Sequence, residues 1–522
     1  MKHSVCNCIL LLLLSSSSVS ATSDAFDIDE STIAGVQSAF AKGTLTSRAL
    51  VEYYLDQIRT LNPLLHAVVE VNPDALDQAD QADREKTAGT AAGGGLHGIP
   101  ILLKDVIATD DRLNTTAGSL AMVGSAVPRD AAVVRKLRAA GAVVLGKASM
   151  SEWHNFRTRN APSGWSARGG QSLNPYVLSE YVCGSSAGSA IAVAANMVSV
   201  SLAAETDGSI SCPSASASVV GIKPTVGLTS RAGVIPLSPR MDTVGPICRT
   251  VADAVEVLEA IVGYDDERDG DATKEASRFV PQDGYKQFLK AEGLKGKRVG
   301  ILRKRFFDFP RDPTKKMAFE AHFTTMRQKG ATLIDDLEIA NMSIILDSRK
   351  SGEQAVMLAE FKISLNAYLS ELLHSQVRSL QDVIDFNNKH RVEERIDDLG
   401  QSTLLAAQET TGLGPVEQRA VANMARLSAE GLERLMKENQ LDTVVAPDAS
   451  ATSIFAIGGY PGISVPAGYG ERGRPFGIFF GGLRGSEPKL IEIAYGFEQA
   501  TKARKAPSFL YDGCASTGRV PC

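Results

Sequence analysis

The sequence lacks the patterns that mark metal proteins, nucleic-acid-binding proteins and membrane proteins. It has seven histidines in 522 residues, no H-E-x-x-H motif and no pair of C-x-x-C motifs, so no metal site is predicted. The formal net charge of -5 provides no basic surface for nucleic acid or an anionic membrane. No apolar segment reaches the roughly 20 residues that a membrane-spanning helix needs, so no stable span is expected.

The remaining composition is that of an ordinary globular protein. Apolar residues make up 44% of the chain and charged residues 22%, which is enough for a large hydrophobic core. No internal repeat stands out and no long polar linker divides the chain. We therefore predict one large domain, whereas the sequence makes no prediction about its oligomeric state.

The N-terminus has the pattern of a secretory signal peptide. Lys2 supplies a weak positive charge, Ile9 to Leu14 form a short apolar run, and Val19-Ser20-Ala21 fits a cleavage site of small residues. The alternative is a membrane anchor, for which the run is too short. We expect residues 1–21 to be removed and residues 22–522 to be secreted or to enter the secretory pathway.

Five of the seven cysteines lie beyond this predicted signal peptide. In an oxidising compartment, Cys514 and Cys522 are the first candidates for a disulfide, because they could close a short loop at the C-terminus. Cys183, Cys212 and Cys248 sit among small or apolar residues, so we expect buried thiols rather than ligands.

Hydrophobic periodicity predicts helices that alternate with strands. The helices are expected at residues 31–42, 47–61, 130–140, 186–197, 249–262, 314–329 and 495–504. Short apolar runs predict strands at 142–146, 297–302, 331–334, 443–446 and 476–480, and another that ends near Lys104. The more charged stretch 351–440 is predicted to be a helical layer over the sheet. This alternation favours an α/β fold.

Small residues and serines gather in two clusters, Cys183 to Ser189 and Glu205 to Ser214, on either side of an apolar segment that is predicted to be a buried helix. Small residues let backbone N–H groups approach a ligand closely, and a serine can attack that ligand when a base takes its proton. Lys104 could be the base, because burial lowers the pKa of a lysine. Lys104, a serine of the first cluster and Ser209 therefore form a candidate catalytic set.

With these motifs in this order, the chain resembles the amidase signature family of hydrolases. The resemblance runs from about Lys104 to Ala252 and resumes at Gly458 to Gly462; between Glu205 and Pro224 it is closest to bacterial peptide amidases and plant amidases. It implies a single α/β domain with a central mixed sheet covered by helices on both faces. It also implies hydrolysis of a carbon–nitrogen amide bond in a small-molecule or peptide substrate, through an acyl-enzyme and without a cofactor.

The resemblance implies a role for each matching residue. Ser209 would be the nucleophile, and Ser185, after a cis Gly184–Ser185 bond, would pass its proton to Lys104. Ser186 would be a supporting residue. Cys183 and Ala187 stand where glycine is commoner in the family, and both are small enough to leave the chemistry intact. The oxyanion would be held by four backbone N–H groups, those of Thr206, Asp207, Gly208 and Ser209.

Two other interpretations remain open. The segment Gly184 to Gly188 also matches G-x-S-x-G, the motif of an α/β-hydrolase-type esterase with Ser186 as nucleophile. That enzyme would need a histidine partner, and His322, His374 and His390 lie in charged helical segments that look like solvated surface. The chain could also be a non-catalytic binding protein, in which replacing Ser209 would leave the function intact. Peptide, fatty-acid and aryl amides are all substrates within the family, and some members release ammonia from glutamine for a partner enzyme, so the substrate is not predicted.

Overall fold

The structure is a computed structural model that describes residues 26–265 and 267–508. The predicted signal peptide and the predicted Cys514–Cys522 disulfide lie outside the described residues, so both stay predictions.

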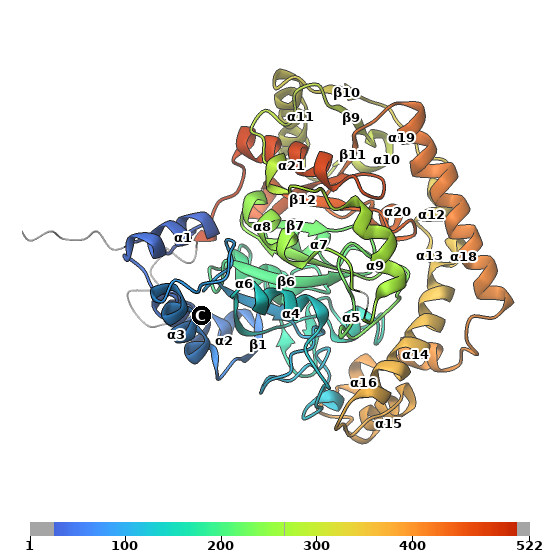
Figure 1. Ribbon diagram of the computed structural model, residues 1–522. Helices are drawn as coiled ribbons and strands as arrows, with labels where there is room; N and C mark the ends of the chain where they lie inside the picture. The colour runs from blue at the N-terminus through green and yellow to red at the C-terminus, as the bar shows by residue number, and fades with distance from the viewer. Residues whose placement is uncertain (1–25, 266, 509–522) are drawn as a thin grey trace, which may run out of the picture.

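A mixed β-sheet of eleven strands runs through the described part of the chain (Figure 1). In spatial order its strands are β1 (Val68–Val71), β3 (Val143–Ala148), β2 (Pro100–Lys104), β6 (Val200–Glu205), β8 (Thr243–Cys248), β7 (Val220–Lys223), β12 (Gly462–Tyr469), β13 (Pro475–Gly481), β11 (Thr443–Pro447), β9 (Arg298–Ile301) and β10 (Thr332–Ile334). Strands β3, β2 and β6 are parallel, as are β11, β9 and β10, and the strands between these two groups pair antiparallel. Strands β4 (Trp165–Ser166) and β5 (Gly170–Gln171) form a separate ribbon.

Helices flank this sheet, which confirms the predicted α/β class. They are α1 (Ile33–Lys42), α2 (Ser47–Leu65), α3 (Ala75–Thr87), α4 (Ala132–Ala139), α5 (Glu152–Asn155), α6 (Ala187–Ala194), α7 (Ser211–Ser216), α8 (Val251–Ile261), α9 (Gly270–Ala276), α10 (Arg303–Phe306), α11 (Pro313–Gln328), α20 (Thr452–Ala456) and α21 (Glu487–Thr501). Helix α21 begins eight residues before the predicted start at residue 495. Pro488 explains the difference, because a proline reads as a loop signal in the sequence but is also favoured in the first turn of a helix.

The stretch 351–440 is helical, as predicted. Two short helices, α12 (Met342–Ile345) and α13 (Ser348–Ser351), lead into it. The stretch itself contains α14 (Glu353–Glu371), α15 (Leu380–Lys389), α16 (Ile396–Leu399), α17 (Ser402–Gln408), α18 (Pro415–Ser428) and α19 (Arg434–Glu438). Helix α14 packs against α13, α15, α17 and α18. Figure 1 shows these helices, in yellow to orange, along one side of the molecule.

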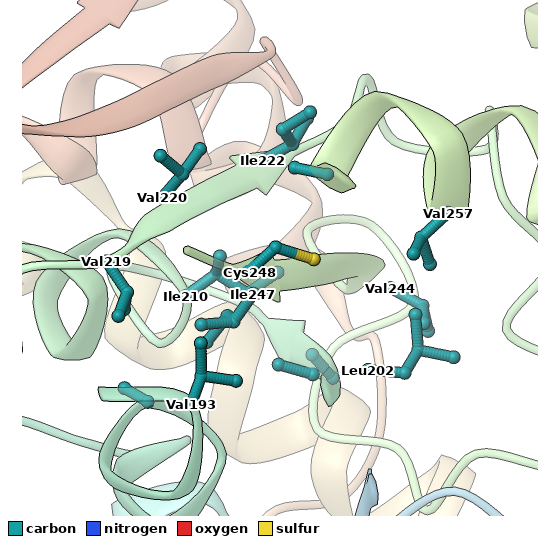
Figure 2. Packing of buried hydrophobic residues seen from close by; sticks show 14 of the residues in the cluster. Val193, Leu202, Ile210, Val219, Val220, Ile222, Val244, Ile247, Cys248 and Val257 are labelled. Atoms are coloured by element: carbon teal, nitrogen blue, oxygen red, sulfur yellow. The ribbon is translucent and has the colours of Figure 1, made fainter. Parts of the chain in front are cut away.

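The core lies directly beneath the second serine cluster. Ile210, the residue after Ser209, is fully buried together with side chains from β6, β7 and β8 (Figure 2). Cys248 lies in the same apolar cluster as a buried free thiol, as predicted. Because Ile210 is held by this packing, the backbone next to Ser209 has little freedom to move.

A buried ion-pair cluster joins the helical side of the molecule to the sheet domain. The Arg157 guanidinium donates to the carboxylates of Glu152 and Glu394, at 2.9 Å in each case, and all three side chains are at most 1% exposed. Arg157 Nε also donates to the carbonyl of Gly400, just after α16, at 3.1 Å. Burial raises the pKa of Glu152, and the Arg157 guanidinium opposes this rise because it favours the charged carboxylate.

Replacing Arg157 by methionine should destabilise the fold by about 3 kcal/mol or more, because two buried carboxyl groups lose their charged partner. The measurement is urea unfolding at pH 7. The control is Arg159→Ala, which removes an exposed arginine two residues away and should change the unfolding free energy by less than about 0.5 kcal/mol. Equal effects of the two substitutions would contradict this account.

Candidate active site

The structure brings Lys104 and Ser185 into direct contact. Lys104 is the last residue of the buried strand β2, and its Nζ donates to Ser185 Oγ at 2.8 Å and to the carbonyl of Ala204 at 2.9 Å. The Lys104 side chain is completely buried and Ser185 is 1% exposed. A lysine whose amine hydrogen-bonds to a serine hydroxyl, with both groups buried, has the geometry of a general base and the group it deprotonates.

Burial lowers the pKa of Lys104 from 10.5 to about 7. The carboxylates of Asp242 and Glu205 act in the opposite direction, because they favour the ammonium form, but burial has the larger effect. A substantial fraction of Lys104 is therefore the neutral amine near pH 7, and only that form can accept a proton.

Ser209 lies in the segment next to Ser185. The backbone N–H of Ser186 donates to the carbonyl of Ser209 at 3.2 Å, and the Gly184–Ser185 peptide bond is cis, as predicted. The two hydroxyls of Ser185 and Ser209 do not hydrogen-bond to each other within the described residues. Such catalytic contacts are often long without substrate and shorten when it binds.

The segment from Thr206 to Ser209, here called the oxyanion loop, connects β6 to α7. None of its four backbone N–H groups donates to an acceptor within the described residues. Gly208 has φ +82°, a conformation that strains any residue with a Cβ atom. Four free donors in one tight turn fit the predicted oxyanion-binding role.

Glu205 organises the loop, a role that its place in the sequence does not predict. Its Oε2 atom accepts from the N–H groups of Ile210 and Ser211 at 2.7 and 2.8 Å, and from the Ser211 hydroxyl at 2.9 Å. Because these contacts cap the N-terminus of α7, Ser209 is held between the end of β6 and the capped start of α7. The cap is unusual in that the carboxylate comes six residues before the second N–H group it binds, outside the spacing of a capping box.

Two side chains of the oxyanion loop anchor it to other parts of the chain. Thr206 Oγ1 donates to Asp242 Oδ1 at 2.5 Å, and Asp242 Oδ2 accepts from the N–H groups of Leu237 and Ser238. Burial raises the pKa of Asp242 to about 6. The second contact is from Ser453 Oγ in α20, which donates to Asp207 Oδ2 at 2.7 Å. Neither Asp242 nor Ser453 lies in a serine cluster, so only the fold identifies them.

Cys183 and Cys212 form a disulfide, with their Cα atoms 5.6 Å apart. The expectation that both are buried thiols is therefore wrong. The pairing leaves no sign in the sequence because 29 residues separate the two cysteines, and only the packing of the two serine clusters brings them together. Cys183 directly precedes Gly184, and Cys212 lies in the first turn of α7. The bond therefore links the segment of Ser185 to that of Ser209.

The structure does not support Ser186 as the nucleophile. Its hydroxyl is fully buried and donates to the carbonyl of Ala204 at 3.2 Å. The three candidate histidines also lie elsewhere. His322 is half-buried rather than solvated, and its Nε2 atom hydrogen-bonds to the carbonyl of Ala467. The ring of His390 stacks on that of Phe386. His374 pairs through its backbone with Ala126.

Two cavities border the catalytic segments. One of about 180 Å³ is lined by Ala204 and Thr206, and another of about 660 Å³ by Cys183 and Cys212. Within residues 26–265 and 267–508, no group of three or more acidic, histidine or cysteine side chains is arranged to hold a metal ion. No helix in that part of the chain has the length and apolar character to cross a membrane.

Comparisons with known proteins identify the family of the chain. The model of a family described as Amidase matches residues 49–454. A protein of Arabidopsis thaliana described as "Probable amidase" is 55% identical over 504 residues, which cover 96% of each chain. A glutamyl-tRNA(Gln) amidotransferase chain of Halorhodospira halophila is 30% identical over 91% of this chain and 98% of its own.

A solved structure gives the same result for the fold. The native peptide amidase of Stenotrophomonas maltophilia superposes with a TM-score of 0.86 at 43% identity, covering 92% of this chain and 99% of its own. The agreement extends over nearly the whole of both chains. The chain therefore belongs to the amidase signature family and is an enzyme that hydrolyses amide bonds.

Proposed function

We propose that this enzyme cleaves its amide substrate through an acyl-enzyme on Ser209, with Ser185 and Lys104 as a proton relay. The observation that carries the proposal is the 2.8 Å contact between Lys104 Nζ and Ser185 Oγ in a fully buried setting. A buried neutral amine can accept the proton that a serine must lose, and no histidine is needed.

In the first step, Ser209 Oγ attacks the amide carbonyl. Its proton moves to Ser185 Oγ while the Ser185 proton moves to Lys104 Nζ. The negative charge that develops on the carbonyl oxygen is stabilised by the free N–H groups of the oxyanion loop. Lys104 then returns a proton through Ser185 to the departing amine, the carbon–nitrogen bond breaks, and the acyl group stays on Ser209.

In the second step, water hydrolyses the ester. Water gives a proton through Ser185 to Lys104 as its oxygen attacks the acyl carbon, and the same N–H groups hold the second oxyanion. The ester bond breaks, Ser209 recovers its proton, and the carboxylic acid leaves. Lys104 and Ser185 thus act as base in one half of each step and as acid in the other.

For the substrate, we propose peptide-type amides. Support comes from the peptide amidase of Stenotrophomonas maltophilia, which is 43% identical over 99% of its length. Release of ammonia from short peptide amides, compared with free glutamine, tests the assignment. Turnover of glutamine alone would favour the chemistry of the more distant amidotransferases instead.

We also propose that the enzyme works in the secretory pathway or outside the cell. The N-terminal pattern of residues 1–21 supports this proposal, and so does the Cys183–Cys212 disulfide, since disulfides persist mainly in oxidising compartments.

The value of kcat/KM for a peptide amide should rise with pH and level off above about pH 7. Burial lowers the pKa of Lys104 to about 7, so below that value the ammonium form dominates and the rate should fall about tenfold per pH unit. The measurement is ammonia release between pH 5 and pH 8. A rate that is constant through this range would contradict a neutral lysine base.

A serine-reactive fluorophosphonate should label Ser209, and Lys104→Ala should abolish the label. Mass spectrometry of the labelled peptide locates the site. Ser450→Ala, which removes an exposed serine from the loop after β11, is the control and should leave labelling and turnover unchanged. A label on Ser186 would contradict the mechanism and restore the esterase interpretation.

The protein expressed with its full sequence in a eukaryotic host should reach the medium with Thr22 as its first residue. Peptide mapping without reduction should find Cys183 joined to Cys212 and a free Cys248. Retention in the cytosol with an intact N-terminus would overturn the proposed location.

A further inference from the structure

Glu360 carries a buried carboxyl group that the proposed mechanism does not use. It lies in the middle of α14 and is 6% exposed. One of its oxygens accepts from the hydroxyl of Ser238, which is fully buried, and the other accepts from Arg240 Nε at 3.1 Å. Because Ser238 is 122 residues away in the chain, the contact joins the helical segment to the sheet domain.

Ser238 belongs to the segment 237–242, here called the Asp242 turn, which closes on the side chain of Asp242. The backbone N–H groups of Leu237 and Ser238 donate to Asp242 Oδ2 at 2.8 and 2.9 Å. The N–H of Asp242 donates back to the carbonyl of Ser238 at 2.8 Å. Ser238 is therefore bonded to Asp242 through its backbone and to Glu360 through its hydroxyl, so a displacement of Ser238 would also displace Asp242.

The other oxygen of Asp242 holds the oxyanion loop. Thr206 Oγ1 donates to Asp242 Oδ1 at 2.5 Å, and the backbone N–H of Thr206 is one of the free donors of that loop. A continuous path of hydrogen bonds thus begins at Glu360, passes through the Asp242 turn and ends at Thr206. It connects a helix of the segment 351–440 to the group of donors that the mechanism assigns to the oxyanion.

Packing alone does not fix this end of the oxyanion loop. Thr206 and Asp242 both line the cavity of about 180 Å³, together with Pro239 of the Asp242 turn. A side chain beside a cavity lacks packing contacts on that side, so its position depends more on its hydrogen bonds. The Arg231 guanidinium also donates to the turn, at the carbonyl of Pro239. That contact holds an exposed part of the turn, whereas Glu360 holds the buried part.

We propose that Glu360 is a positioning residue, which acts through the Asp242 turn on the oxyanion loop. The inference rests on the proposed function, because it concerns the loop that the mechanism assigns to the oxyanion. With Glu360 in place, the turn keeps the acceptor of the Thr206 hydroxyl where the loop needs it. Without Glu360, the buried Ser238 hydroxyl loses its acceptor and the turn shifts. The N–H donors of the loop then point less well at the oxyanion, where small displacements are costly for catalysis.

Two substitutions of Glu360 test the contact with Ser238. Glutamine and leucine have similar volumes, but only glutamine has an oxygen that can accept from the Ser238 hydroxyl. Glu360→Leu should lower kcat for a peptide amide about tenfold or more with little change in KM, because the loss falls on the transition state. Glu360→Gln should keep kcat to within about threefold of the wild type, because the acceptor is retained.

A double-mutant cycle tests whether the effect passes through Thr206. Thr206→Val keeps the shape of the side chain but cannot donate to Asp242, so it should also lower kcat. If Glu360 acts through this hydroxyl, Glu360→Leu/Thr206→Val should have about the kcat of Thr206→Val alone, whereas independent roles would multiply the two losses.

The matched control is Glu371→Gln, which removes a charge from an exposed position on the same helix and should leave kcat and KM unchanged. Thermal unfolding of each variant shows whether it is folded. If Glu360→Leu is unfolded, Ser238→Ala takes its place in the cycle, because it removes the same contact from the other partner.

Three results would overturn the inference: wild-type kcat in folded Glu360→Leu, equal losses in the glutamine and leucine variants, or losses that multiply in the double variant. Fluorophosphonate labelling of Ser209 separates this failure from failure of the proposed function. A wild type that is labelled and hydrolyses amides, with variants that behave like it, overturns only the role of Glu360. A wild type without label and turnover overturns the catalytic mechanism itself.

Discussion

The exclusion of water from the Lys104 amine is the condition on which the rest of the site depends. In water a lysine is an ammonium ion at neutral pH and cannot accept a proton. At the end of a buried strand, the cost of desolvating the charge lowers its pKa to about 7, even though Asp242 and Glu205 favour the charged form. In the proposed mechanism the large mixed sheet has a chemical role, because strands β3 and β6 flank the strand that carries this amine.

A neutral lysine is useful only if the two serine segments are held together. The link between them is built from several different interactions: a backbone hydrogen bond between Ser186 and Ser209, the Cys183–Cys212 disulfide, and packing of Ile210 in the core. Glu205 adds a cap at the start of α7. Each restrains the same few residues, so the free N–H groups of the oxyanion loop are in place before the substrate arrives.

The helices of residues 351–440 take part in this arrangement. Glu394 pairs with Arg157, and Glu360 of α14 accepts from the hydroxyl of Ser238, whose backbone N–H donates to Asp242. Both contacts place a carboxyl group of the helical segment against a buried partner from the catalytic half of the chain. The helical segment therefore contributes to the geometry of the site as well as covering the molecule.

The sequence by itself determined the family, the α/β class, most of the helices and strands, and the candidate residues Lys104, Ser185 and Ser209. These features are local. Periodicity reports which face of an element is buried, and a motif of small residues and serines keeps its meaning wherever the chain goes.

Only the tertiary structure decided the Cys183–Cys212 disulfide and the partners of the oxyanion loop, which are Asp242 and Ser453. It also decided that Arg157 bonds with Glu394, 237 residues away. Sequence spacing carries no information about such pairs, because each depends on which elements the sheet order places side by side. An isolated glutamate in a charged stretch, such as Glu394, looks like a surface residue until the fold buries it against an arginine.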